Sequence, residues 1–233
     1  MVNIGANIYS GLTFFNNRVL LVPFLLLFLL SLGYTLAPIQ IPTVAFSAAS
    51  ALNLAYSLAA SIVLGLVSLY LTCLIIVIYS QGDRMGIKKA LVVAAKKYFG
   101  FLVASILLLI FVILGLVALI IPGIYIAIKL LFTQQEVVIN RLKPMDALKR
   151  SWEMTDGRFW EIFGFLLVVL IISMVIYFFV LAVSLMSYLI PQAAIATAVS
   201  DVVLSLVSAF ISVFSLCAIT QFFMDSQKRV TKA

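Results

Sequence analysis

Long apolar stretches alternate with short polar gaps along the whole chain. Roughly 20 apolar residues cross the hydrocarbon core of a bilayer as a helix. Six stretches meet that requirement, at about residues 18–36, 52–79, 98–120, 122–140, 159–189 and 193–225. The pattern therefore predicts an all-α, polytopic integral membrane protein, in which residues 1–233 form one domain of six transmembrane helices.

Two of the polar gaps have the period of an amphipathic helix. In the first, one helical face carries Ile87, Leu91, Ala94, Ala95 and Tyr98, and the opposite face carries Lys88, Lys89, Lys96 and Lys97. The second gap begins at Pro144, with one face formed by Met145, Leu148 and Trp152 and the other by Asp146, Lys149, Arg150 and Glu153. Both segments are expected to be amphipathic helices that lie at the membrane interface.

Basic residues gather in alternate gaps, near residue 18 and over residues 84–97, 141–158 and 228–232. The gaps over residues 37–53, 120–123 and 188–196 contain none. The positive-inside rule then places the basic gaps, both amphipathic helices and both termini in the cytoplasm. A multi-pass protein of the cell membrane is expected. Lys129 is the one basic residue that lies away from these gaps.

The composition narrows the range of functions. The net charge of +7 arises from residues at helix ends, so it favours anionic lipid headgroups over nucleic acid as the partner. With two cysteines and no histidine, neither a metal site nor a Ser-His-Asp triad is expected, and no cofactor is predicted. The expected headgroup contacts are Lys88, Lys89, Lys96, Lys97, Lys149, Arg150, Trp152, Arg158 and Trp160.

Polar side chains recur at helical spacing within the second, fourth and sixth stretches. The resulting polar seam consists of Ser57, Ser61, Ser68, Thr72, Thr133, Ser205, Ser208 and Ser212. Because polar groups in a bilayer face other helices or water, these three helices are expected to meet, and the first and third to face lipid. Two interpretations stay open. Small residues allow close helix packing, in this chain or between two copies of it, whereas a polar path would carry a solute.

Two charges lie within predicted membrane helices, Lys129 in the fourth and Asp201 in the sixth. At about 1.5 Å rise per residue, both are expected about 10–15 Å below the outer surface, where they are able to pair. Three interpretations stay open: a salt bridge that fixes helix register, a substrate or proton site, and a Lys129 side chain that extends to a polar surface.

Two segments carry a more specific pattern. Residues 121–129 read Ile-Pro-Gly-Ile-Tyr-Ile-Ala-Ile-Lys, and residues 144–160 read Pro-Met-Asp-Ala-Leu-Lys-Arg-Ser-Trp-Glu-Met-Thr-Asp-Gly-Arg-Phe-Trp. This pattern resembles the membrane-domain family of glycerophosphoryl diester phosphodiesterases and its prokaryotic relatives. The resemblance implies a membrane module without the soluble catalytic domain, with Lys129 at the position where the family often has arginine.

Three functions follow from these features. The first is a non-enzymatic membrane protein that acts through lipid or protein contacts, consistent with the envelope-maintenance role that the resemblance implies. The second is a small transporter or channel whose path follows the polar seam, with Lys129 and Asp201 as binding or gating residues. The third is a lipid-processing enzyme, which the absence of a recognisable nucleophile or metal set disfavours.

Overall fold

The computed structural model describes residues 5, 8–9, 18–36, 48–82, 85–187 and 193–230. Helices account for the regular structure of these residues, so the predicted all-α class is confirmed. Their bounds are α2 Arg18–Leu36, α3 Ala48–Gln81, α4 Ile87–Ala118, α5 Ile120–Lys129, α6 Thr133–Ile139, α7 Pro144–Thr155, α8 Phe159–Ser187 and α9 Ala193–Val230.

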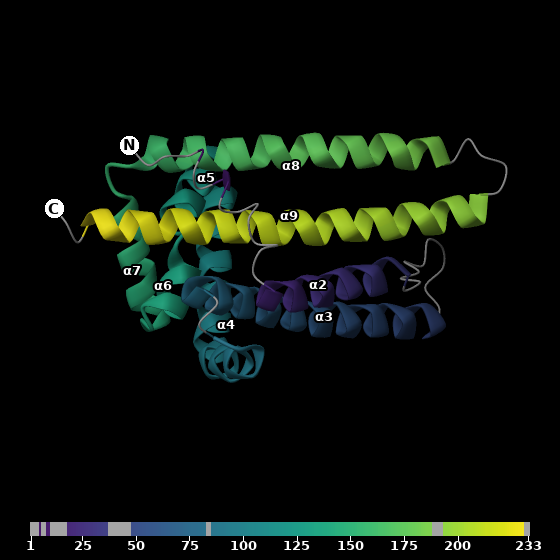
Figure 1. Ribbon diagram of the computed structural model, residues 1–233, viewed down its shortest axis with the longest axis horizontal. Coiled ribbons are helices and arrows are strands. Elements are labelled where there is room, and N and C mark those ends of the chain that lie inside the picture. Colours follow the sequence, from purple (N-terminus) through teal and green to yellow (C-terminus); the bar gives the residue numbers. More distant parts are fainter. Residues whose placement is uncertain are drawn as a thin grey trace.

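Four helices, α2, α3, α8 and α9, run along the long axis of the molecule (Figure 1). Helix α9 lies in the middle of this group and packs against the other three. The short helices α5, α6 and α7 gather beside the C-terminal half of α9, and α4 is seen nearly end-on. Helix α4 packs against all three short helices. One end of the molecule is therefore a compact assembly of α4, α5, α6 and α7.

Four segments of the described chain are long and apolar enough to cross a membrane: Ala55–Gln81, Ile87–Ala118, Phe159–Ala182 and Val199–Arg229. The apolar part of α2 is shorter, at Val19–Gly33. Helices α5 and α6 have 10 and 7 residues, too few to span a bilayer alone. By length and composition the described residues therefore hold four candidate spans, and the predicted six-helix count is not confirmed.

Two predicted elements are wrong in their boundaries. The expected helix over residues 122–140 is divided into α5 and α6 by a break at residues 130–132. The expected separate helix at residues 87–98 is instead the first part of α4, which continues to Ala118. The second predicted amphipathic segment does form a helix of its own, α7, and its buried residues Ala147, Leu148 and Ser151 pack against the protein.

The core lies at the end where the short helices gather. Phe132, in the break between α5 and α6, is fully buried against Phe222 and Phe223 of α9, with ring centroids 6.0 and 5.6 Å away. Phe222 in turn stacks on Phe165 of α8 at 4.5 Å. Many large apolar side chains elsewhere on the long helices are exposed, as expected for surfaces in contact with lipid.

The first and third predicted helices were expected to face lipid, and both expose apolar side chains, α4 more than α2. Only 17% of the most apolar window of α4 is buried in the protein. Helix α2, by contrast, packs against both α3 and α9. The first helix therefore packs on one side against the bundle, while Leu25, Leu26 and Leu29 on its other side are exposed.

Helices α4 and α5 form a tight hairpin. The extended residue Leu119 reverses the chain between them, and α5 returns along α4. Gly115 and Gly123 allow the close approach, because a Cβ atom on Gly123 would lie 2.5 Å from Leu116 Cδ2 and 2.8 Å from Leu116 N. These two glycines bring the helices together without a loop.

We predict that Gly123→Ala lowers the free energy of unfolding by about 1–3 kcal/mol, because the added methyl group overpacks the hairpin. Gly164→Ala on α8 is the matched control, since no atom lies within 4 Å of its added Cβ. Thermal unfolding in detergent compares the two variants. Equal melting temperatures would contradict the close approach of α4 and α5.

Candidate functional site

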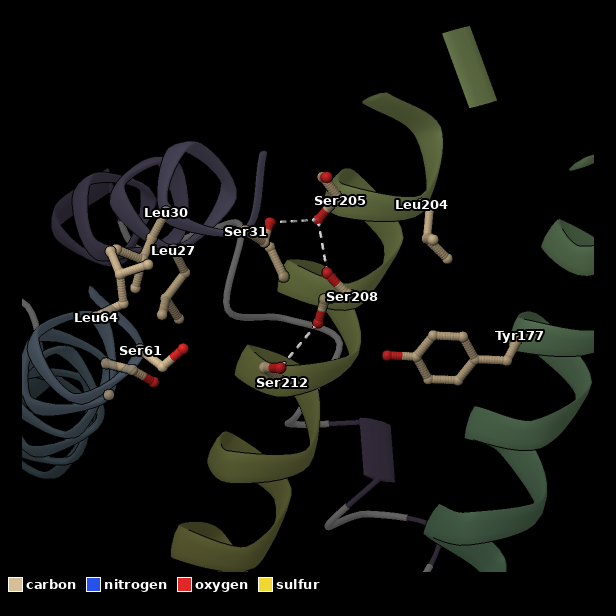
Figure 2. A pocket seen from close by; sticks show the side chains of 13 residues that line it. Leu27, Leu30, Ser31, Ser61, Leu64, Tyr177, Leu204, Ser205, Ser208 and Ser212 are labelled. Carbon is tan, nitrogen blue, oxygen red and sulfur yellow. Dashed lines mark hydrogen bonds between the residues drawn. The ribbon is translucent and has the colours of Figure 1, made fainter. Parts of the chain in front are cut away.

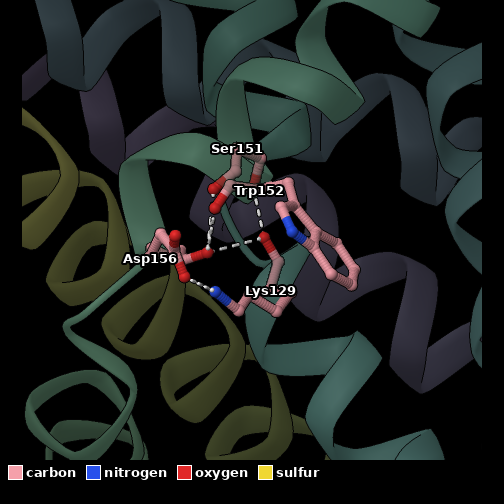
Figure 3. Close-up of polar contacts among 5 residues, drawn as sticks. Lys129, Ser151, Trp152 and Asp156 are labelled. Carbon is pink, nitrogen blue, oxygen red and sulfur yellow. Dashed lines mark hydrogen bonds and ion pairs between the residues drawn. The ribbon is translucent and has the colours of Figure 1, made fainter.

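The structure assigns Lys129 a partner that the sequence analysis missed. Its ammonium Nζ lies 2.8 Å from Oδ1 of Asp156, the residue that ends α7 (Figure 3). The Lys129 side chain is 2% exposed and that of Asp156 is 77% exposed. The pair therefore joins the buried end of α5 to the surface, and it ties α7 to the membrane hairpin.

Ser151 of α7 fills the break between α5 and α6 (Figure 3). Its hydroxyl donates to the carbonyl of Lys129 at 2.9 Å and accepts from the N–H of Phe132 at 3.2 Å. Thr155 Oγ1 also lies 3.2 Å from the Lys129 carbonyl. Helix ends leave backbone groups without partners, so these two hydroxyls satisfy groups that the break would otherwise leave bare.

Two aromatic rings complete the surroundings of Lys129. Its Nζ lies 5.6 Å from the ring centroid of Tyr125 and 5.4 Å from that of Trp152. The two rings also meet edge to face at 6.0 Å. A cation within about 6 Å of a ring face is attracted to its π electrons, so both rings stabilise the charge of Lys129. We call Lys129, Ser151, Trp152, Thr155 and Asp156 the clasp.

Two carboxyl groups near the clasp have shifted pKa values. The hydrogen bond and charge of Lys129 hold the pKa of Asp156 below its usual value. The pair therefore contributes stability at neutral pH, which is lost as the pH falls through the lowered pKa. In α6, burial raises the pKa of Glu136, although Asn140 and Arg150 oppose the rise. Ionisation of Glu136 as the pH rises therefore lowers the stability of the fold, whereas ionisation of Asp156 raises it.

The predicted pair of Lys129 with Asp201 is corrected by this geometry. The ion pair of Lys129 is with Asp156, and Asp201 lies early in α9, far along that helix from its C-terminal half, beside which α5–α7 gather. The Lys129 side chain, itself 2% exposed, meets the surface only through the exposed carboxylate of Asp156. Of the three interpretations of Lys129, the salt bridge between helices agrees with the contacts. Its partner is Asp156 at the end of α7 and not Asp201.

A cavity of about 640 Å³ lies among α2, α3, α8 and α9 (Figure 2). Five residues of the predicted polar seam line it, namely Ser61, Ser68, Ser205, Ser208 and Ser212. Three others, Ser57, Thr72 and Thr133, are absent from its lining. Ser31 and Tyr177 line it without having been predicted. The seam thus joins the second and sixth predicted helices, but the fourth takes no part in the cavity.

Three serine hydroxyls at this cavity donate to carbonyl groups of their own helices. Ser212 donates to Ser208 O, and Ser208 donates to Ser205 O (Figure 2). Ser61 donates to Ser57 O. Each hydroxyl oxygen retains lone pairs. No charged side chain belongs to the lining. The cavity therefore combines uncharged hydroxyl groups with the apolar side chains of Leu27, Leu30 and Leu64, which suits a neutral ligand.

The predicted headgroup contacts divide by exposure. The exposed ones are Lys88, Lys89, Lys96, Lys149, Arg150, Trp152 and Trp160. Lys97 is half-buried and donates to the carbonyl of Val138. Arg158 is also half-buried, with its Nε 3.1 Å from Oε2 of Glu161. Most of this set is therefore available at the surface, while Lys97 and Arg158 also hold the structure together.

Residues 100–232 match the family model of the membrane domain of glycerophosphoryl diester phosphodiesterase. The chain belongs to this family. No curated protein and no solved structure matches it. The resemblance seen in the sequence is thereby confirmed, and the protein is a multi-pass membrane protein of a family defined by a membrane domain and not by a catalytic one.

The family match covers the clasp but only part of the hydroxyl-lined cavity. The clasp residues all lie within residues 100–232. The cavity takes Ser31 from α2 and Ser61 from α3, which precede the matched residues. The two segments that carry the resemblance in the sequence supply the clasp: Lys129 ends the first, and the second contains Ser151, Trp152 and Asp156.

We predict that Ser151→Ala lowers the free energy of unfolding by about 1–3 kcal/mol, because it removes the hydroxyl that satisfies two buried backbone groups. Ser173→Ala on α8 is the control, since that hydroxyl donates to Val169 O of its own helix. Thermal unfolding in detergent measures both. A Ser151 variant as stable as the Ser173 variant would mean that the break between α5 and α6 does not depend on the two hydrogen bonds of Ser151.

Proposed function

We propose that this protein is a non-enzymatic integral membrane protein that acts by binding anionic lipids at its basic end, in the service of membrane maintenance. The observation that carries the proposal is the pairing of exposed basic residues with exposed aromatic ones. Lys149 and Arg150 are exposed on α7 next to Trp152, which is 42% exposed, and Trp160 at the start of α8 is 78% exposed.

This combination suits the boundary between headgroups and acyl chains. Aromatic rings favour the headgroup level, and lysine or arginine near the surface attracts anionic lipid. The start of α4 adds a second region of the same kind, with Lys88, Lys89 and Lys96 exposed near Phe99, which is 77% exposed. Because α4 packs against α7, the two regions belong to the same end of the molecule.

The clasp supports this function by position. Asp156 and Ser151 tie α7 to the buried end of α5, so the basic side chains of α7 are held against the membrane hairpin. Membership in a membrane-domain family fits a role in contacts within the bilayer. Binding rather than catalysis is the simplest use of such a surface.

We predict that the purified protein retains phosphatidylglycerol in preference to phosphatidylcholine from mixed micelles, and that added salt weakens this preference. Lys149→Gln with Arg150→Gln is expected to lower it about fourfold, twofold for each exposed and screened charge. Native mass spectrometry counts the retained lipids.

The neighbouring Glu153→Gln variant is the control, because it alters the same surface of α7 without removing a positive charge. It is expected to leave the preference unchanged or to raise it. Equal retention of the two lipids by the unaltered protein would refute the proposed function.

A second function has its own supporting observation, the hydroxyl-lined cavity of about 640 Å³. Its lining is uncharged and combines hydroxyl groups with apolar side chains, which fits a neutral polyol-like solute better than an ion. As a transporter or channel, the protein would use Ser61, Ser205 and Ser208 as contacts for the solute. The Lys129–Asp201 pair has no part in this version, since Lys129 is bound to Asp156.

For this second function, glycerol should enter vesicles containing the protein faster than protein-free vesicles. Ser208→Leu fills the cavity and should return uptake to the protein-free rate, whereas Ser173→Leu, outside the cavity lining, should leave it fast. Stopped-flow light scattering measures vesicle swelling. Identical rates with and without the unaltered protein would argue against this function.

A further inference from the structure

A second, smaller cavity of about 490 Å³ lies where α4 passes the end of α6. Three cationic side chains line it, Lys96 and Lys97 from α4 and Arg141 from the residues after α6. Gly100, Val137 and Leu142 supply its uncharged walls. No carboxylate belongs to the lining. The cavity therefore concentrates positive charge on one side of an apolar wall.

The positive charges of this cavity are not neutralised by the part of the chain that the structure describes. Ion pairs among these residues are formed by Lys129, Arg150, Arg158 and Lys228. Lys96, Lys97 and Arg141 make none. Like charges brought together repel, and walls of low dielectric constant increase the effect. An anion would therefore gain from binding here.

The backbone also holds Arg141 in an unusual conformation. Its φ is 57°, and it is the one residue other than glycine with a positive φ among those described. Helices often end with a left-handed residue, but that residue is usually glycine, since a side chain there costs roughly 1–2 kcal/mol. Such strain concentrates at functional positions. An arginine at this position is thus explained by what its side chain does.

Lys97 is held in place by the opposite wall. Its ammonium donates to the carbonyl of Val138 near the end of α6. One turn further along α4, Gly100 lacks a side chain, and a Cβ there would meet only Val137 Cγ1, at 3.6 Å. The cavity thus has one cation held in place, Lys97, and two exposed cations, Lys96 and Arg141. Because Gly100 leaves space beside them, the cavity suits a compact anion.

We propose that this cavity binds the phosphate group of an anionic membrane lipid. The inference rests on the proposed function and deepens it by naming one site within the basic end. A lipid fits better than a soluble phosphate because the walls formed by Val137 and Leu142 are apolar, and because α4 continues from the cavity into its largely exposed apolar half. The headgroup contacts the cations while the acyl chains lie along α4.

The test compares two double variants with the same change of charge. Lys96→Gln with Arg141→Gly removes two cavity cations, and the glycine also relieves the strained backbone, so folding should be preserved. Lys88→Gln with Lys89→Gln removes two exposed cations from the same helix, outside the cavity. Lys97 is left in place because it bonds to Val138.

Retention of phosphatidylglycerol by the full chain is measured by native mass spectrometry, with thermal unfolding as the check on folding. The cavity variant is expected to lose affinity roughly 25-fold, fivefold for each cation that contacts the phosphate. The control variant is expected to lose about fourfold, since its charges are exposed and screened. Arg141→Lys, which keeps the charge, should retain most of the affinity.

The outcomes separate the inference from the function on which it rests. Equal losses in the two double variants would overturn the cavity site, while leaving the general lipid-binding function intact. No preference for phosphatidylglycerol in the unaltered protein would overturn both. Calorimetry with inorganic phosphate in lipid-free detergent gives the remaining arm: tight binding that depends on Arg141 would keep the anion site but overturn its assignment to a lipid.

Discussion

The fold depends on how the backbone is satisfied at the break between α5 and α6. A helix interrupted inside a membrane protein exposes carbonyl and N–H groups, and hydrocarbon offers them no partner. Ser151 resolves this by donating to the Lys129 carbonyl and accepting from the Phe132 N–H. The break can then persist, and it lets Phe132 insert against Phe222 and Phe223 of α9. A continuous helix would not give the ring the same path into this core.

The charge of Lys129 determines where α7 packs at the break between α5 and α6. A buried ammonium loses hydration, and that cost is offset here by one carboxylate and two aromatic rings. Because Asp156 lies at the end of α7, the ion pair is satisfied only when α7 is seated on the hairpin. The apolar membrane segment and the basic surface helix are therefore joined by one polar cluster. The exposed basic and aromatic residues of α7 are therefore positioned by the buried contacts of Lys129 with Asp156 and Ser151.

Much of this was readable from the sequence, and the failures have a common cause. The apolar stretches predicted the helices, α2 with its observed bounds. The reversal into the hairpin lies at Leu119, whereas the sequence pattern had placed a gap between helices at residues 120–123, which belong to α5. The break at residues 130–132 was invisible because Leu130, Leu131 and Phe132 continue the apolar run. The groups that satisfy it come from Ser151, a tertiary contact that the local pattern does not show. The same error displaced Lys129, whose depth and partner were inferred from a straight helix. Ser31 was missed because a single serine in an apolar helix forms no periodic pattern of polar residues.

The break also reaches the cation-lined cavity. Since α6 restarts after Phe132 and ends at Ile139, its length fixes where the chain turns left-handed at Arg141. That turn brings Arg141 to Lys96 and Lys97, and the Lys97 bond to Val138 closes the same wall. A continuous helix through residues 130–132 would rotate and shift everything after it, which would separate Arg141 from the two lysines. The backbone bonds of Ser151 therefore support both the α7 surface and the cavity beside α4, and the basic end behaves as one unit.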